Sequence, residues 1–224
     1  MRLRRINLAL IALSIFAFGS FASADILVPG ASGPPDIFAL AGTSLQASIS
    51  GPWANTTSTM SGTYVTAVFS DPANTFCAGC LDFMYQVTNN VGSTDSVGRT
   101  TAINFTGWLT DVGFAANGSS LGGGFVNGTV VPVTVDRSGS GDSIGFSFTP
   151  FSASIQAGQT SNVLVIETNA TNFAPGFFSL IDGGVTTVAA FEPTAARVPE
   201  GSALGMLGIS GFALLGAMKR KFVS

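Results

Sequence analysis

The stretch VPVTVDRSGSGDSIGFSF, residues 131–148, decides the fold that we expect for this chain. Valine occupies every second position from 131 to 135, and apolar side chains again occupy every second position from 144 to 148. Residues 138–141 between them consist of Ser and Gly, which favour turns. Alternation with a period of two predicts a strand, so the stretch predicts two antiparallel strands joined as a β-hairpin.

Further short apolar segments occur on both sides of this hairpin, separated by clusters of Gly, Asn, Asp, Ser and Pro. The clearest are residues 64–69, 81–87, 163–167 and the hairpin 177–190, and weaker candidates are residues 101–108 and 124–126. No segment of residues 25–191 sustains the 3.6-residue apolar period of a helix. About ten short strands in one domain predict an all-β fold, a single β-sandwich of Ig-like or jelly-roll-like type, with another barrel as the alternative.

The first residues of the chain have the order of a secretory leader. Arginines near the start precede an apolar run at residues 8–18, and Ala22 and Ala24 place small side chains at the two positions that signal peptidase reads. We expect residues 1–24 to form a signal helix that enters the secretion translocon and is cleaved after Ala24. The alternative is a transmembrane anchor, which the short run and the lack of a basic stop disfavour.

At the other end, residues 201–218 form an uncharged apolar segment that precedes Lys219-Arg220-Lys221. As a helix rising about 1.5 Å per residue it would be about 27 Å long, close to the hydrocarbon core of about 30 Å. Every face of this helix would be apolar or small, so it is not an amphipathic surface helix. A buried core helix is the alternative, but the three cations favour a transmembrane helix with a cytoplasmic C-terminus.

Val198-Pro199-Glu200, the apolar segment and Lys219-Arg220-Lys221 together resemble the PEP-CTERM sorting signal of Gram-negative bacteria, also known as an ice-binding-protein C-terminal domain. The resemblance covers residues 198–222, and Gly201 stands where the family pattern usually has a second proline. It implies recognition by an exosortase, a membrane-embedded cysteine protease or transpeptidase. It also implies an inner-membrane intermediate with its domain in the periplasm, and then a place at the cell surface or in the extracellular matrix. Residues 192–197 would be an exposed linker.

The charge of the region between the two signals excludes several classes of function. Residues 25–200 hold all 12 acidic residues but only three cations, Arg99, Arg137 and Arg197, and they contain neither Lys nor His. A domain this acidic is a poor nucleic-acid binder, because phosphate contacts need Arg and Lys. Without His, a Ser-His-Asp triad and a Cys-His pair are impossible, and without Lys so is a lysine nucleophile. We therefore expect neither enzyme activity nor a cofactor.

Cys77 and Cys80 are the only cysteines and have the C-x-x-C spacing. In the cytosol this spacing would suggest redox or zinc chemistry. The secretory leader directs the chain to an oxidising compartment, where disulfides persist, and zinc would lack further Cys or His ligands. We expect a structural disulfide that holds the turn before the strand at residues 81–87, and no metal site.

Most carboxylates of the domain lie in or beside predicted turns, where Asp accepts hydrogen bonds from nearby backbone N–H groups. They are Asp71, Asp82, Asp95, Asp111, Asp136, Asp142, Glu167 and Asp182. Residues 136–142 superficially resemble a calcium loop but lack the acidic alternation and the closing glutamate of an EF-hand. We therefore expect most of these carboxylates to cap turns.

These features predict a non-enzymatic surface or extracellular-matrix protein, sorted by exosortase and associated with exopolysaccharide in a biofilm. One alternative is a carbohydrate-binding module that presents exposed aromatic side chains, for which the candidates are Trp53, Tyr64, Tyr85 and Trp108. A second alternative is a glycoside hydrolase, which needs two carboxyl groups facing each other across a sugar.

Overall fold

The structure is a computed structural model that describes residues 26–182 and 184–195. The predicted signal helix with Ala22 and Ala24, and the predicted sorting segment with its transmembrane helix at residues 201–218, lie outside these residues. Within the described part of the chain, no helix is long and apolar enough to cross a membrane. The interpretations of the two ends of the chain therefore stay predictions.

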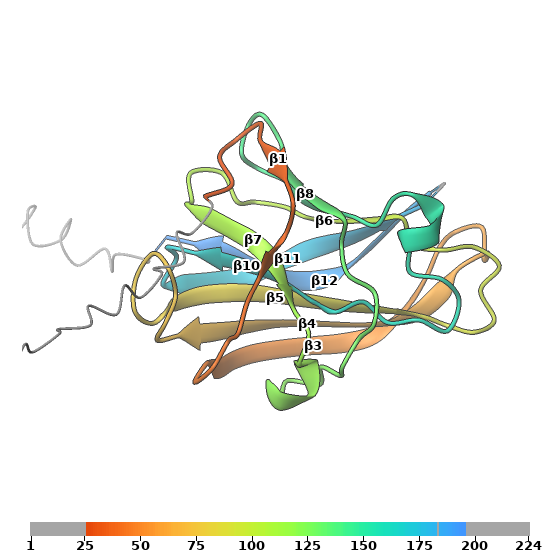
Figure 1. Ribbon diagram of the computed structural model, residues 1–224, viewed down its shortest axis with the longest axis horizontal. Coiled ribbons are helices and arrows are strands. Elements are labelled where there is room, and N and C mark those ends of the chain that lie inside the picture. Colours follow the sequence, from red (N-terminus) through yellow and green to blue (C-terminus); the bar gives the residue numbers. More distant parts are fainter. Residues whose placement is uncertain (1–25, 183, 196–224) are drawn as a thin grey trace, which may run out of the picture.

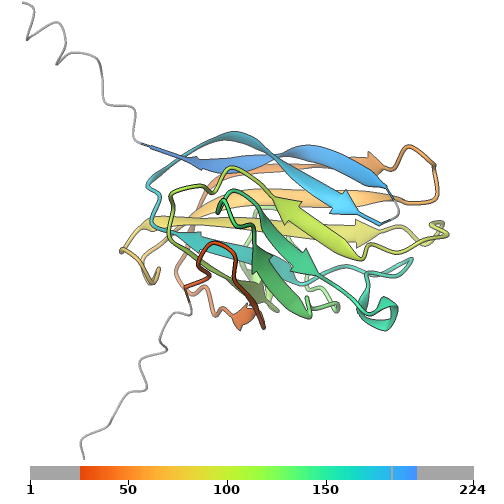
Figure 2. The same ribbon diagram turned by 90° about the horizontal axis from the view of Figure 1, so that it is seen from above.

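The described residues are all-β, with twelve strands and two short 3-10 helices, η1 (Gly118–Ser120) and η2 (Phe151–Ala153). The strands are β1 (Ser32–Gly33), β2 (Asp36–Ile37), β3 (Ser44–Ala54), β4 (Ser61–Asp71), β5 (Cys80–Asn89), β6 (Arg99–Ala102), β7 (Thr110–Ala115), β8 (Thr134–Arg137), β9 (Ile144–Ser147), β10 (Val163–Thr168), β11 (Asn172–Ile181) and β12 (Val185–Thr194). Sheet A has the order β1-β8-β9-β6-β11-β12, and sheet B has the order β2-β7-β10-β5-β4-β3. Figures 1 and 2 show the long strands of both sheets running along the length of the molecule.

The predicted central hairpin is confirmed in its pairing, because β8 pairs antiparallel with β9 and Val135 lies opposite Phe146. Its first strand is shorter than expected: β8 begins at Thr134, and the exposed Val131 and Val133 lie before it. Other strands pair around this hairpin: β7 with β10 in sheet B, and β6 with β11 in sheet A. The chain crosses between the sheets from β1 to β2, then at each step from β5 to β8, and again from β9 to β10 and from β10 to β11. The two sheets are thus wound around one hairpin rather than built one after the other.

The main core lies between the two sheets and contains the inward side chains of both. In sheet B, Phe83 and Tyr85 of β5 point into it, and in sheet A, Phe146 and Phe178 do so. The rings of Tyr85 and Phe178 stack with centroids 4.4 Å apart and an interplanar angle of 11°. Two sheets packed across one apolar layer are consistent with the predicted β-sandwich.

The expected strands at residues 64–69, 81–87 and 163–167 and the final hairpin are confirmed as β4, β5, β10 and β11–β12. Of residues 101–108 only the first two lie in a strand, because Asn104 and Gly107 have positive φ angles of 72° and 84°. Residues 124–126 are not a strand, since Gly122, Gly123 and Gly124 all have positive φ. Positive φ is incompatible with the extended backbone of a strand.

The last strand extends beyond the boundary that the sequence suggests. Strand β12 continues to Thr194, which pairs with Asn172, so residues 192–194 belong to sheet A and not to the expected linker. Pro193 is tolerated there because β12 is an edge strand, where a missing N–H leaves no ladder bond unmade.

The outer face of sheet B is also covered, by loops, so its central strands are not exposed to solvent on one side as in many antiparallel sheets. Met84 of β5 and Val165 of β10 point away from the main core and join a second apolar cluster with Leu40 and Phe125, which come from loops. Strands β5 and β10 are consequently buried on both faces. Polar residues at their outward positions are therefore buried too, and these residues form the candidate site.

Candidate functional site

Three carboxylates lie side by side across the centre of sheet B. Glu167 of β10 is the register partner of Asp82 on β5 and of Asp111 on β7. Directly paired residues in a sheet project from the same face, so all three side chains occupy one row on the outer face. All three residues are at most 5% exposed. Sheet pairing thus brings together residues that are distant in the chain.

A fourth carboxylate, at the end of β4, forms a compact cluster with two of these three, Asp82 and Glu167. Asp71 is the last residue of β4 and is 2% exposed. Carboxylate oxygens of Asp71, Asp82 and Glu167 all lie within 4.8 Å of one another. We call these three residues the carboxylate cluster.

The loop at residues 72–79 covers the carboxylate cluster and hydrogen-bonds to each of its members. The backbone N–H of Ala73 donates to Oδ1 of Asp71 at 2.7 Å, and that of Thr75 donates to Oε2 of Glu167 at 3.2 Å. The side-chain amide of Asn74 donates to Oδ1 of Asp82 at 2.8 Å. One oxygen of every carboxylate is therefore used to hold the loop in place.

Two more carboxylates adjoin the carboxylate cluster. Asp36 of β2 lies close enough to Asp111 and Glu167 to raise the pKa of both carboxyl groups. Strand β2 approaches β7 closely because its register partner there is Gly113, where a Cβ atom would collide with the Asp36 backbone. This close approach places five carboxylates in one region of sheet B.

Neither arginine of the described residues neutralises this charge. Arg99 pairs with Asp136, with its Nη1 2.6 Å and its Nη2 2.7 Å from the carboxylate oxygens. Arg137 is buried, and its guanidinium donates to four backbone carbonyls and to the hydroxyl of Thr110. The described chain contains no Lys or His. The five carboxylates thus have no cationic side chain beside them.

The pKa values of these carboxyl groups reflect that environment. Burial, and next the negative charge of Glu167, raise the pKa of Asp82 to about 9. Burial raises the pKa of Asp111 to about 8, with added effects from Asp36, and burial also raises the pKa of Glu167. A carboxylate in a low-dielectric site without a cation is costly, so protons are held there at neutral pH.

The cysteines stand directly beside the carboxylate cluster. Cys77 and Cys80 are joined by a disulfide, with Cα atoms 5.3 Å apart. Cys80 is the first residue of β5, so the bridge closes the loop at residues 72–79 at its junction with that strand. The disulfide therefore holds the turn that the sequence suggested, and that turn is the cover of the carboxylate cluster.

The expectation that most carboxylates cap turns is wrong for the strand residues. Asp71 does accept from the backbone N–H two residues on, and Asp95 from that of Ser96. In contrast, Asp82, Asp111 and Glu167 lie within strands and are buried. The two carboxylates of the segment that resembles a calcium loop have partners of their own: Asp136 pairs with Arg99, and Asp142 accepts from Thr106 at 3.3 Å.

Three of the four aromatic side chains considered for sugar binding are buried. Trp53, Tyr64 and Tyr85 are at most 8% exposed and belong to the main core, and Trp108 is partly buried against it. Sugar-binding platforms need an exposed ring face, and these side chains offer none or little. The large exposed aromatics in the described residues are Phe151 and Phe177 instead.

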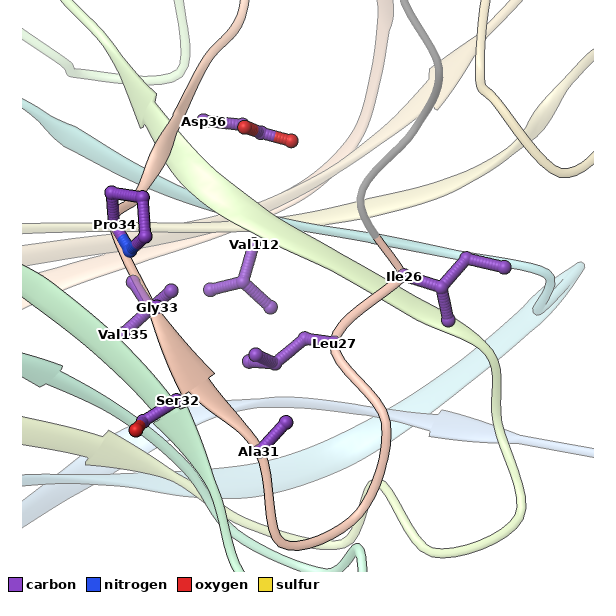
Figure 3. A pocket seen from close by; sticks show the side chains of 9 residues that line it. All are labelled: Ile26, Leu27, Ala31, Ser32, Gly33, Pro34, Asp36, Val112 and Val135. Carbon is purple, nitrogen blue, oxygen red and sulfur yellow. The ribbon is translucent and has the colours of Figure 1, made fainter.

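A small cleft lies where the N-terminal segment passes from sheet A to sheet B. Its volume is about 90 Å³, and it is lined by Leu27, Val112, Val135 and other residues together with one carboxylate, Asp36. Figure 3 shows Leu27 and Val112 near the centre of the cleft, with Asp36 set apart from them. Ligand pockets are commonly about 300–1,000 Å³, so this cleft is too small for a sugar.

Sequence reasoning missed the carboxylate cluster because strand register decides it. Asp82 and Glu167 each adjoin apolar strand residues, and a charge inside such a run is the one signal that the sequence carries. Their pairing, and the burial of the outer face, depend on which strands are neighbours in sheet B. Comparison with protein-family models, curated proteins and solved structures finds no match to this chain.

Proposed function

We propose that this chain is a non-enzymatic surface or extracellular-matrix protein, exported through its leader and sorted by exosortase. The observation that carries the proposal is the pair of terminal signals, with Ala22 and Ala24 at one end and Val198-Pro199-Glu200 with Lys219-Arg220-Lys221 at the other. The all-β domain between them supports it, since its disulfide suits an oxidising compartment. Association with exopolysaccharide is part of the same proposal.

We further propose that the sandwich is of the jelly-roll-like type rather than the Ig-like type. The pairs β8–β9, β7–β10 and β6–β11 nest around one hairpin, and the chain alternates between the sheets as it does so. A rolled-up hairpin that forms two sheets is the winding of a jelly roll.

The arrangement of carboxylates supports a non-enzymatic function over a glycoside hydrolase. Catalytic carboxyl groups must face a sugar in an open site. One cleft of the described residues is lined by Asp36 and another by Asp182, each with a single carboxylate. The paired carboxylates of sheet B are instead buried beneath a loop.

The intact mass of the protein in its host, with and without exosortase, tests the proposal. We expect a mass that begins at Asp25 and ends near Glu200, and we expect this species to be lost in cells without exosortase. A mass that still includes residues 219–224 in cells with exosortase would contradict sorting and indicate a permanently tethered domain. A mass that still includes residues 1–24 would contradict cleavage of the leader.

A further inference from the structure

We propose that Asp71, Asp82 and Glu167 form a binding site for Ca²⁺. This proposal goes beyond sorting and surface location and stands independently of them, because it rests on the geometry of sheet B. The ion would lie among the ends of β4, β5 and β10, beneath the loop at residues 72–79.

The spacing of the three carboxylates suits Ca²⁺. Calcium binds oxygen ligands at about 2.3–2.6 Å, so two oxygens on opposite sides of one ion are about 5 Å apart. The oxygens of Asp71, Asp82 and Glu167 lie within 4.8 Å of one another, which allows a single ion to contact all three. The proposed site therefore needs no rearrangement of the strands.

The second observation is an unpartnered oxygen that belongs to the carboxylate cluster. Asp82 is 0% exposed, and its Oδ2 accepts no hydrogen bond from a described N–H or hydroxyl group, so a proton on Asp82 is its only means of bonding to the neighbouring carboxylate of Asp71. Its Oδ1 is held by Asn74, so the orientation of the carboxylate is fixed. A buried polar atom without a partner costs on the order of 1–3 kcal/mol, and more when it is charged. An ion ligated by Oδ2 removes that cost.

Hydrogen bonds from the loop at residues 72–79 also fix the orientation of the other two carboxylates, Asp71 and Glu167. Asp71 uses Oδ1 and Glu167 uses Oε2 to accept backbone N–H groups of the loop. Oδ2 of Asp71 and Oε1 of Glu167 accept none of these backbone hydrogen bonds, which leaves one oxygen of each carboxylate for an ion. Ligands that are already oriented by outer hydrogen bonds lose less freedom when a metal binds.

The chemistry of the ligands selects calcium among the common divalent cations. Carboxylate oxygens are hard ligands, whereas structural zinc sites use Cys and His. Cys77 and Cys80 are joined to each other, and the domain contains no His. Mg²⁺ demands near-ideal octahedral geometry at about 2.1 Å and retains its waters, so a cluster buried under a loop suits Ca²⁺ better. The neighbouring Asp36 adds attraction for any divalent cation.

Calcium titration of the full chain, purified in mild detergent and stripped with EGTA, tests the proposal. We expect one Ca²⁺ to bind with a dissociation constant below about 1 mM, the range of extracellular calcium modules. At a Ca²⁺ concentration about 100-fold above that constant, Tm should rise by about 5–10 °C. Mg²⁺ at the same concentration should produce a smaller shift.

Variants distinguish a calcium ligand from a residue that only supports the fold. Asp82→Asn should weaken Ca²⁺ binding at least 10-fold, yet in EGTA it should be as stable as the parent chain or more so. Glu167→Gln should weaken binding similarly. Asp142→Asn, in the segment that resembles a calcium loop, is the matched control and should leave binding unchanged.

Several results would overturn the assignment. They are no binding of Ca²⁺ at millimolar concentration, equal stabilisation by Mg²⁺, binding that survives both Asp82→Asn and Glu167→Gln, and binding that is lost in Asp142→Asn. Sorting by exosortase is judged separately by intact mass, so either proposal can fail without the other.

Discussion

Arg137 is a buried cation whose partners are almost entirely backbone. Its guanidinium donates to the carbonyls of Leu27, Phe105, Trp108 and Gly141 at 2.8–3.1 Å. These carbonyls come from the N-terminal segment, the loop before β7 and the β8–β9 turn. Arginine suits this position because its planar group offers five N–H donors in a fixed arrangement. One side chain thus joins three segments that lie far apart in the chain.

Arg137→Lys should lower the free energy of unfolding by about 2–4 kcal/mol, because an ammonium group cannot reach all of these acceptors and leaves buried carbonyls unpaired. The measurement is chemical denaturation followed by fluorescence. Arg99→Lys is the control: this ion pair is about one-third exposed, so the change should cost no more than about 1 kcal/mol. Equal losses for the two variants would contradict the anchoring role of Arg137.

The raised pKa of Asp82 leads us to expect that the metal-free chain becomes less stable as pH rises. This pKa rises from 3.8 to about 9 on folding, so between these values the folded state binds a proton that the unfolded state releases. The stabilisation is complete below about pH 4 and is lost as pH rises through 9. In EGTA, the free energy of unfolding should therefore fall between pH 5 and pH 9 by on the order of a few kcal/mol.

Denaturation curves across that pH range measure this effect. The raised pKa of Asp111 acts in the same direction, so Asp82→Asn should flatten the pH dependence without removing it. Stability that increases from pH 5 to pH 9 in EGTA would show that the cluster is ionised when metal-free.

At the scale of elements, β5 is the central feature because both of its faces are buried. Its inward residues fill the main core, and its outward residues hold the loops that cover sheet B. Gln86 binds the loop between β7 and β8: its Nε2 donates to the carbonyl of Val126 at 2.7 Å, and its Oε1 accepts the Val126 N–H at 2.9 Å. Its Nε2 also donates to Ser161 at 2.9 Å. Strand β5 thereby fixes a loop that has no regular pairing of its own.

Gln86→Met should release that loop while preserving side-chain volume. We expect a loss of about 2 kcal/mol and faster hydrogen exchange of the amides around Val126, with exchange in the β8–β9 hairpin unchanged. Gln46→Met is the control, since Gln46 is exposed and bonds only to Ser44. Unaltered exchange near Val126 would mean that Phe125, packed on Phe69, holds the loop alone.

The disulfide should stabilise the folded state because it closes a loop in the unfolded chain. Replacing Cys77 and Cys80 together by Ser should cost about 2 kcal/mol of stability by the loop-closure relation. The same loss should follow when the parent chain is reduced, as measured by thermal unfolding with and without a thiol. A double variant as stable as the oxidised parent would show that the hydrogen bonds of residues 73–75 suffice to hold the loop.

The regular strands were predictable from the sequence where one face repeats every second residue, as in β5 and β9. Strand β3 was not, because it includes Gly51-Pro52 and is an edge strand with mostly exposed residues. Residues 124–126 suggested a strand because the buried Phe125 packs onto sheet B from a loop. Periodicity reports which side chains are buried, and it cannot tell a strand from a loop that covers one.

The carboxylate cluster shows the same limit for function. Asp82 and Glu167 are 85 residues apart in the chain and become direct partners only through the pairing of β5 with β10. The cysteine spacing, in contrast, is local, so the turn that it holds could be placed from the sequence. Features set by a short segment, such as the Cys77–Cys80 turn, were predictable, whereas features set by strand order, such as the carboxylate cluster, were not.

At the scale of the whole molecule, the two sheets share one core and should unfold together. Phe178 of sheet A stacks on Tyr85 of sheet B and is fully buried. Phe178→Ala should cost about 3–5 kcal/mol. Near-ultraviolet circular dichroism and tryptophan fluorescence should still report one coincident transition.

The neighbouring Phe177 provides the control for this prediction. It lies on the same strand but is 55% exposed, so Phe177→Ala should change stability by less than about 1 kcal/mol. Two separate transitions in the Phe178 variant would show that each sheet has a stable core of its own.

The positions of the two arginines also determine how well the folded domain resists proteases that cut after basic residues. Residues 26–182 and 184–195 offer trypsin only Arg99 and Arg137. Arg99 lies in β6 between β9 and β11, and Arg137 lies in β8 with its side chain buried. A protease must draw an extended segment into its own active site, which neither strand permits until sheet A opens. Trypsin therefore cuts this domain only through states in which sheet A has opened, and where opening and closing are fast relative to cleavage, the cutting rate follows the population of those open states.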